Sequence, residues 1–279
     1  MTRFLSNRLN RYNLIAITFL AVICLLWIYP FAWIFFASFK TQLAMFSDRW
    51  RLWPKPWVWD NYVRAWVGAN FSGYFGNTLL YAVWSTTVGT AISAMCGYAL
   101  ARYRFPGSGL LRAIILGLLF LPVPSTIIPT FMLVKTLGLL NTRWAILLAM
   151  SGGGAFHTML FMGAFDAIPE EMYDAAVVDG ANFRQQFTLA FPLVSAATAT
   201  VAIFRFMGSW NSFFMPLVFS LGRPELRTLA VGLRAFQGEF SFDWTGFAAA
   251  MAISVTPVIL LFVFFQRYIV SGLAGAVKG

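Results

Sequence analysis

Long apolar segments constrain this 279-residue chain more than any other feature. A transmembrane helix needs about 20 consecutive, mostly apolar residues, and six segments have that length and character. They cover residues 14–36, 75–100, 110–133, 144–165, 191–219 and 247–265. The sequence therefore predicts an all-α membrane protein with six transmembrane helices in a 14–265 membrane domain, and short ends at 1–13 and 266–279.

The composition excludes several other classes of protein. Charged residues make up only 11% of the chain, whereas soluble domains carry about 25%, which excludes an ordinary cytosolic enzyme and a disordered chain. The formal net charge is +10, but the Lys and Arg residues are dispersed among apolar segments, so no nucleic-acid surface is expected. Cys24 and Cys96 lie in apolar segments and predict neither a disulfide framework nor a metal site.

The first apolar segment is predicted to remain as a membrane span and not to be cleaved as a signal peptide. Its apolar run is too long, and Trp27, Pro30 and Trp33 occupy the place where small residues mark a cleavage site. Six spans place both ends on one side of the membrane. The charges leave open which side, because a cytoplasmic N-terminus puts nine Lys and Arg in the inside segments and ten in the outside segments.

Residues 40–74, between the first two spans, hold five of the 11 tryptophans, interleaved with Arg and Pro. This mixture is typical of a segment at the level of the lipid headgroups. We expect a collar on the membrane surface with no role in substrate binding.

Two of the predicted spans contain helix-breaking residues. The third holds a group of prolines and hydroxyl residues, namely Pro122, Pro124, Ser125, Thr126, Pro129 and Thr130, and the fourth holds Gly152, Gly153 and Gly154. A broken helix is tolerated at membrane depth only where the freed backbone faces protein or a wet cavity. Interrupted spans are therefore the better indication of a transport pathway.

The hydrophilic loop between spans four and five carries half of the chain's ten acidic residues. These are Asp166, Glu170, Glu171, Asp174 and Asp179. Pro169 suits a first helical position, Gly180 suits a helix end with positive φ, and Asn182 with Gln185 resembles a capping box for a second helix over 183–189. Small Ala175 and Ala176 permit close approach, so we expect a compact docking surface for a basic partner.

The fifth span carries a stripe of polar or small residues at helical spacing: Ser195, Thr198, Ala202, Arg205, Ser209 and Ser212. Such a stripe faces either a partner helix or a wet pathway. For Arg205, the alternatives are a pathway role or hydrogen bonds to backbone carbonyls exposed by the broken third span. His157 is expected to be a neutral hydrogen-bonding residue, with a proton relay as the alternative. Trp210 and Asn211 are expected either to line the pathway or to pack between helices.

Asp174-Ala175-Ala176, three residues and Gly180 resemble the EAA motif of permease subunits in binding-protein-dependent ABC importers. Asp174 stands where the motif has Glu, Ala190 where it has Ile, and Pro192 arrives one residue early. Further matches resemble the carbohydrate branch, in particular the second permease of maltose-type importers. They are Asn77, Tyr98 to Arg102 followed by Phe105-Pro106-Gly107, Leu121-Pro122 with Ile128-Pro129, Gly208 to Asn211, and the ending from Gln266 to Gly279.

The resemblance implies a type I ABC importer permease fold in which loop 166–188 is cytoplasmic and its first helix is a coupling helix. Glu170, Glu171, Asp174, Ala175, Ala176 and Gly180 would couple to an ATPase, and Val277, Lys278 and Gly279 would contact it through the tail. The partners implied are a second permease as heterodimer, two ATP-binding subunits and an extracytoplasmic solute-binding protein, in a bacterial or archaeal inner membrane. Pathway or substrate contacts are expected from Ser125, Thr126, Arg205, Ser209, Trp210, Asn211 and Ser212.

This chain itself is not expected to be an enzyme or to hold a cofactor. Its four lysines lie outside any G-x-x-x-x-G-K-[ST] sequence, so ATP and Mg²⁺ are expected in the partner. Three alternatives remain at this stage. They are an ABC permease for a non-sugar solute, an ion-coupled secondary transporter using Arg205 and His157, and a structural membrane anchor.

Overall fold

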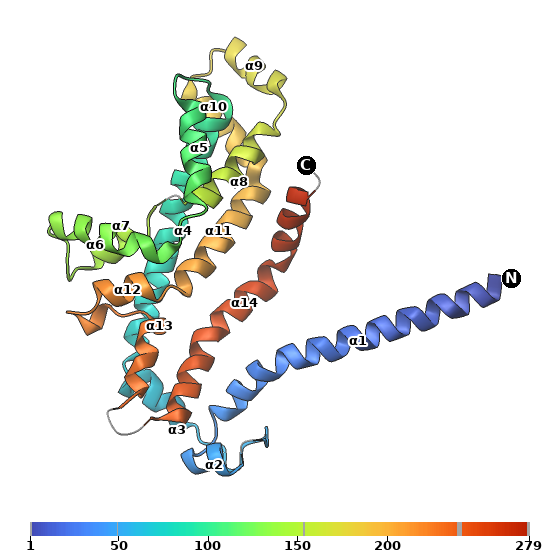
Figure 1. The fold of residues 1–279 in the computed structure, drawn as a ribbon, viewed down its shortest axis with the longest axis vertical. Helices are drawn as coiled ribbons and strands as arrows, with labels where there is room; N and C mark the ends of the chain where they lie inside the picture. The colour runs from blue at the N-terminus through green and yellow to red at the C-terminus, as the bar shows by residue number, and fades with distance from the viewer. Residues whose placement is uncertain (1, 49, 153, 239–241, 278–279) are drawn as a thin grey trace. The chain divides into compact units, whose positions relative to one another are not determined.

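The computed structural model describes residues 2–48, 50–152, 154–238 and 242–277. Within these residues the secondary structure is helical, apart from one antiparallel bridge between Gln237 and Phe242 (Figure 1). The elements, in chain order, are α1 (Thr2–Ala37), α2 (Gln42–Ser47), α3 (Asp60–Val63), η1 (Arg64–Gly68), α4 (Phe71–Arg102), α5 (Ser108–Leu118), η2 (Val123–Thr126), α6 (Ile127–Thr136), α7 (Arg143–Ala149), α8 (Ala155–Asp166), α9 (Glu170–Val178), α10 (Phe183–Ala190), η3 (Phe191–Val194), α11 (Ser195–Trp210), α12 (Phe214–Phe219), η4 (Pro224–Leu226), α13 (Leu229–Gly232), η5 (Leu233–Phe236) and α14 (Trp244–Val277).

Four stretches of helix in the described residues are long and apolar enough to cross a membrane: Leu14–Ala37, Phe71–Arg102, Phe183–Trp210 and Trp244–Gln266. They correspond to the first, second, fifth and sixth predicted spans. The prediction of an all-α membrane protein is therefore confirmed.

The third and fourth predicted spans are not continuous helices. The third is divided into α5 and α6, with η2 between them. Pro122 lies between α5 and η2 and does not continue the helix of α5, because proline lacks a backbone N–H. Pro129 is accommodated in the first turn of α6, where no backbone N–H is required. The fourth is divided into α7 and α8, and α8 starts after Gly154, whose φ is +74°. The helix-breaking residues identified in the sequence thus lie at real breaks.

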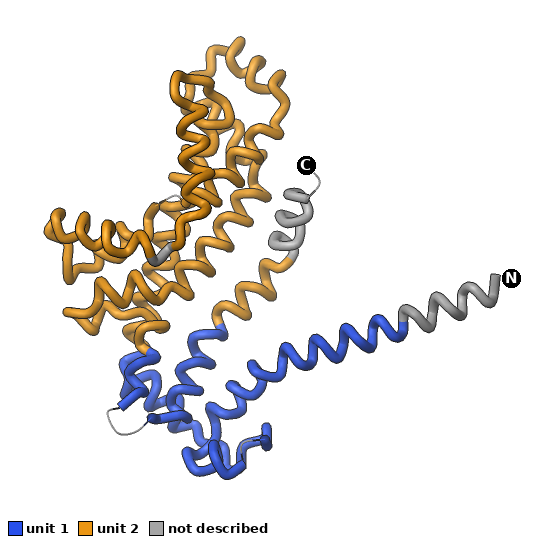
Figure 2. Tube along the Cα trace, viewed as in Figure 1, with its two compact units in different colours: residues 1–71, 233–256 blue, residues 72–232, 257–279 orange. Residues whose placement is uncertain are grey.

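The chain divides into two compact units, 1–71 with 233–256 and 72–232 with 257–279 (Figure 2). In the first unit, Ala37 and Met45 pack against Ala248 at the start of α14. Asn61, which is 1% exposed, donates from its amide nitrogen to the carbonyls of Ser38 and Lys40, both at 2.8 Å. This buried amide ties the segment after α1 to α3.

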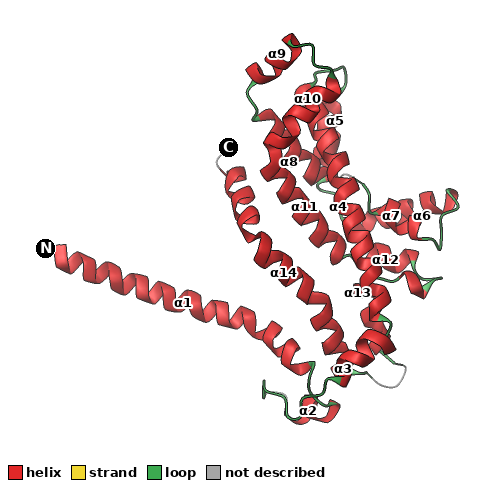
Figure 3. Ribbon diagram, turned by 180° about the vertical axis from the view of Figure 1, so that it is seen from behind, coloured by secondary structure: helices red, strands yellow, loops and turns green. Residues whose placement is uncertain are grey.

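The second unit has two hydrophobic cores. One joins α4, α8, α9, α10 and α11 through Tyr98, Phe161, Phe165, Tyr173 and Val201. The other joins α4, α6, α7 and α12 through a set that includes Tyr81, Val134, Ile146 and Phe219. In opposite views, α6, α7 and α12 project together from one side of the α5, α8 and α11 group (Figures 1 and 3). The breaks in the third and fourth spans allow this change of direction.

Candidate functional site: the acidic loop and the buried arginine

The acidic loop folds as two short helices joined by a left-handed turn, as the sequence predicts. Pro169 is the N-cap of α9, one residue before the helical position that the sequence predicts for it, and α9 begins at Glu170. Gly180 has a φ of +75°, which residues with a Cβ atom rarely adopt. At the start of α10, the Asn182 side chain accepts from the Gln185 N–H at 3.1 Å. The Gln185 side chain in turn accepts from the Asn182 N–H at 2.8 Å. The predicted capping box is therefore present.

Arg102, the last residue of α4, connects that helix to α9. Its Nη1 lies 3.1 Å from Glu170 Oε1, its Nη2 lies 3.7 Å from Asp174 Oδ1, and its guanidinium carbon lies 4.3 Å from the centroid of the Tyr173 ring. The two acidic side chains stay 77% and 70% exposed, so oxygen atoms remain accessible to a second partner. Exposed ion pairs contribute about 0–1 kcal/mol, so Arg102 orients α9 more than it stabilises the fold.

Tyr173 anchors α9 in the first core of the second unit. Its side chain is 3% exposed, and its ring centroid lies 6.3 Å from that of Tyr98. Desolvation raises the pKa of the Tyr173 phenol, although the charge of Arg102 opposes the shift. Sequence reasoning missed both Tyr173 and Arg102. The available signals were the lone aromatic residue in α9 and a basic residue at the end of α4.

Around the buried Tyr173, the surface of α9 is open. Met172, Val177 and Val178 are 39%, 55% and 87% exposed, Ala175 is exposed and Ala176 is half-buried. Small and apolar side chains thus lie beside carboxylates on a helix fixed from behind by Tyr173. This arrangement is suited to docking a protein surface that offers a groove and basic groups.

Arg205 lies within α11 and is 7% exposed. Its Nε donates to the Ser85 carbonyl of α4 at 3.1 Å, and its Nη2 donates to the Gly152 carbonyl at 2.6 Å and lies 3.5 Å from the Met150 carbonyl. Nη1 lies 3.3 Å from Nδ1 of His157 in α8. Nδ1 is the acceptor, because a guanidinium has only donors. The expected hydrogen bond of His157 across helices is present.

Apart from the Ser85 carbonyl of α4, the carbonyls around Arg205 come from the break in the fourth predicted span, between α7 and α8. The expectation that they would come from the third span is wrong, because the third span breaks around Pro122, whereas the chain beside Arg205 breaks after Ala149. Gly89 of α4 makes room for the arginine, since a Cβ atom at this position would overlap the Arg205 guanidinium. A Cβ atom on Gly154 would approach His157 Nδ1 to 2.8 Å.

The other predicted pathway residues are spread over α11, the residues just after it and η2. Ser209 and Trp210 are buried, Trp210 packing on Phe75 with a centroid distance of 5.7 Å. Asn211 is exposed and donates from Nδ2 to the Met207 carbonyl of its own helix at 2.9 Å. Ser125 and Thr126 are exposed in η2, and Ser212 is half-buried. Gly153, Lys278, Gly279 and the side chain of Val277 lie outside the described residues.

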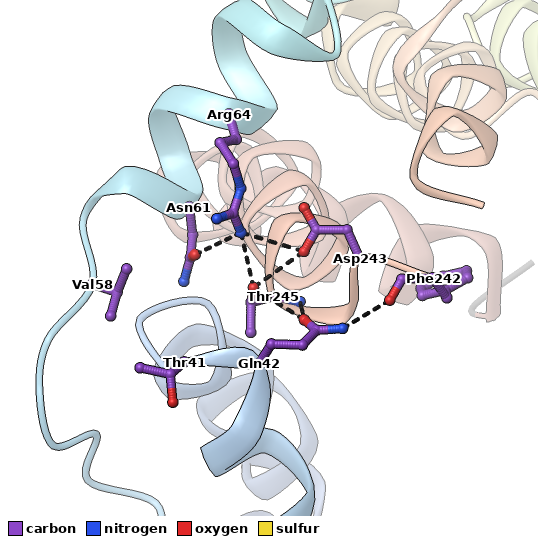
Figure 4. A pocket seen from close by; sticks show the side chains of 8 residues that line it. All are labelled: Thr41, Gln42, Val58, Asn61, Arg64, Phe242, Asp243 and Thr245. Atoms are coloured by element: carbon purple, nitrogen blue, oxygen red, sulfur yellow. Dashed lines mark hydrogen bonds and ion pairs between the residues drawn. The ribbon is translucent and has the colours of Figure 1, made fainter. Parts of the chain in front are cut away.

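A separate polar cavity of about 550 Å³ lies in the first unit. Its residues are Thr41, Gln42, Val58, Asn61, Arg64, Phe242, Asp243 and Thr245 (Figure 4). Arg64 Nη2 lies 2.9 Å from Asn61 Oδ1, 3.0 Å from Thr245 Oγ1 and 3.3 Å from Asp243 Oδ1. Asp243 Oδ1 also accepts from the Gly246 N–H at 2.9 Å. These contacts hold the start of α14 against α3 and η1. The polar residues of this cavity therefore have a structural role.

The fold and the acidic loop define a class: a multi-span helical membrane protein with a compact, acidic helical loop between two of its spans. Residues 89–275 match the family described as the binding-protein-dependent transport system inner membrane component. The chain belongs to this family. It is therefore a membrane component of an ABC transport system, and the resemblance seen in the sequence is confirmed.

Relatives of known role agree with this assignment. The chain is 32% identical over 273 residues to a diacetylchitobiose uptake system permease protein of Streptomyces coelicolor, covering 96% of this chain and 90% of that protein. It is 30% identical to an arabinooligosaccharides transport system permease protein of Halalkalibacterium halodurans, covering all of both chains. A chain in the crystal structure of a bacterial ABC transporter that imports alginate superposes with a TM-score of 0.81 at 25% identity, covering 92% of this chain and 96% of that one.

Proposed function

We propose that this chain is a permease subunit of an ATP-driven importer for a sugar, an oligosaccharide or a sugar-derived solute. The observation that carries the proposal is the acidic loop, which presents Glu170, Asp174 and small residues outward while Tyr173 holds α9 in the core. The saccharide uptake roles of the relatives support the solute class.

The remaining subunits follow from the same proposal. A second permease completes the pathway, two ATP-binding subunits hold ATP and Mg²⁺, and a solute-binding protein delivers the solute from outside. α9 is the coupling helix and lies in the cytoplasm, and six spans then place both ends of the chain there too. This chain contributes no residues to ATP hydrolysis, since no phosphate-binding G-x-x-x-x-G-K-[ST] sequence is present.

The proposed mechanism transmits motion through α9. When the ATP-binding subunits close on ATP, the coupling helices of the two permeases are carried together. Tyr173 lies in one core with Tyr98 of α4, Phe165 of α8 and Val201 of α11. Because this core is closely packed, a displacement of α9 moves these helices with it, and Arg102 adds a polar link to α4. The spans then swing to open the pathway outward.

Purification from native membrane with identification of the bound subunits tests the proposal. Two ATP-binding subunits and a second permease should co-purify with this chain. In vesicles, uptake of labelled oligosaccharide should require the binding protein and internal ATP. Uptake by this chain without any ATPase would contradict the proposal and favour an ion-coupled transporter. ATP-dependent uptake restricted to amino acids, polyamines or phosphate would contradict the solute class.

A further inference from the structure

Arg205 is a charged side chain buried in a membrane segment, where a charge costs free energy and is usually retained for a function. Its described partners are backbone carbonyls of Ser85, Met150 and Gly152 and the imidazole of His157. These groups belong to three parts of the second unit: α4, the break between α7 and α8, and α8 itself. One guanidinium on α11 therefore contacts α4, α8 and the break itself.

The break between α7 and α8 leaves backbone carbonyls that need hydrogen-bond donors. α7 ends at Ala149 and α8 begins at Ala155, so the carbonyls of Met150 and Gly152 lose the N–H groups that a continuous helix would supply. Backbone of this kind is tolerated within a membrane only when protein or water satisfies it. The planar guanidinium offers five donors in fixed directions. Its Nη2 donates to the Gly152 carbonyl of the break, and its Nε donates to the Ser85 carbonyl of α4. The Met150 carbonyl lies 3.5 Å from Nη2 and also accepts from Ser85 Oγ at 2.8 Å.

Gly89 completes the arrangement. A Cβ atom here would overlap Nη2, Cζ and Nε of Arg205, so the guanidinium occupies the space that any other residue's side chain would take. Gly76 lies in the same helix, α4, and a Cβ atom there has no neighbour within 4 Å. Gly89 and Gly76 thus differ in their relation to Arg205, although both belong to α4.

We propose that Arg205, seated against Gly89, is a positioning residue that fixes the break between α7 and α8 to α4 and so sets the direction in which α8 enters the acidic loop. In this role Arg205 does not contact solute. The proposal rests on the proposed function at one point only, namely that α8 leads to the coupling helix. The hydrogen bonds between Arg205 and the chain between α7 and α8 can be tested independently of transport.

The test is a double-mutant cycle of Arg205→Met and Gly89→Ala in the complete complex, with Gly76→Ala as the matched control. Each single variant should lower ATP-dependent uptake by about tenfold or more, within the range of known coupling effects. Each should also raise the hydrogen-exchange rate of the amides in the first turn of α8. The double variant should be no worse than either single variant, because both changes remove the same contact. Gly76→Ala should match the unmodified chain.

Several outcomes would overturn the proposal. They are normal uptake and exchange in Gly89→Ala, additive losses of uptake or assembly in the double variant, and lost uptake in Arg205→Met with unchanged exchange. The last result would instead indicate direct contact with solute. Arg205→Lys should recover part of the exchange protection, since an ammonium group donates but cannot span all three carbonyls. Absence of ATP-dependent uptake by the unmodified complex would contradict the proposed function. The hydrogen-exchange rates of these variants would still test the role of Arg205.

Discussion

At the scale of the single residue, Asp174 and Arg205 show how the surroundings of a charged side chain determine which groups it can bind. The Asp174 side chain is 70% exposed and lies 3.7 Å from Arg102, so its charge remains available to another protein. Arg205 is 7% exposed, and its donors are directed at backbone carbonyls. The exposed acid is suited to a partner surface, whereas the buried base is suited to holding its own chain.

Gly180→Val should abolish transport while the chain still inserts and assembles, because a β-branched residue is strongly disfavoured at a φ of +75°. The measurement is solute-stimulated ATP hydrolysis by the purified complex. Gly180→Asn is the matched control and should retain most of the activity, since asparagine adopts this conformation most readily after glycine. Equal activities for the Val and Asn variants would contradict the role of the turn.

Asp174→Lys should also abolish stimulated ATP hydrolysis, because it replaces an acceptor with a cation beside Arg102 and reverses the charge offered to the ATPase. Asp174→Glu, which restores the acid of the EAA motif, should remain active. Pull-down of the ATP-binding subunit in parallel distinguishes lost docking from lost coupling. Full stimulation in the Lys variant would remove Asp174 from the docking surface.

At the scale of the element, α9 is held by one aromatic side chain and oriented by one ion-paired arginine. Tyr173 is 3% exposed, and its hydroxyl has no hydrogen-bond partner among the described residues. The ring is therefore the useful part of the residue, and the hydroxyl only carries a desolvation cost. Because the ring and the hydroxyl of Tyr173 contribute differently, two substitutions at this position should have different effects on transport.

Tyr173→Phe should leave transport unchanged, because it keeps the ring and removes an unpaired hydroxyl. Tyr173→Ala should destabilise the packing of α9 by about 3–5 kcal/mol, the usual cost of truncating a buried aromatic residue. It should uncouple ATP hydrolysis from uptake. Protease sensitivity of the acidic loop and the ratio of uptake to hydrolysis are the measurements. A large loss in the Phe variant would assign a role to the hydroxyl that the described contacts do not supply.

At the scale of the whole molecule, the six predicted spans and the acidic loop predict a topology in the membrane. Loop 166–188 lies between predicted spans four and five, and residues 220–246 lie between predicted spans five and six. We therefore expect the two regions to face opposite sides. Val178 is 87% exposed and Leu221 is 67% exposed, so each provides a reporter position.

In a chain with Cys24→Ala and Cys96→Ala, expressed without the ATP-binding subunits that would cover α9, a cysteine at Val178 should react with an impermeant maleimide only from the cytoplasmic side. A cysteine at Leu221 should react only from outside. Labelling of intact cells and of inverted vesicles measures this difference, and ATP-dependent uptake by the same variants in the complete complex confirms that each is correctly folded. Labelling of both positions from one side would contradict the six-span topology.

Some features of this protein follow from the sequence by itself because they depend on short-range physics. Apolar segments of sufficient length predict spans, since the energy of transfer into lipid is a sum over neighbouring residues. The turn at Gly180 and the capping box of Asn182 and Gln185 were likewise predicted, because backbone conformation and caps depend on residues within a few positions. The breaks at the prolines of span three and the glycines of span four belong to the same group.

Other features were decided by the tertiary structure. Arg205 bonds a carbonyl 120 residues away at Ser85, and Arg102 pairs with Glu170 across 68 residues. No local pattern encodes these partners, so the sequence assigned the carbonyls around Arg205 to the wrong broken span and gave no role to Gly89, Arg102 or Tyr173. A guanidinium can satisfy any nearby carbonyl or carboxylate, and only the packing of α4, α8 and α11 determines which of them lie within its reach.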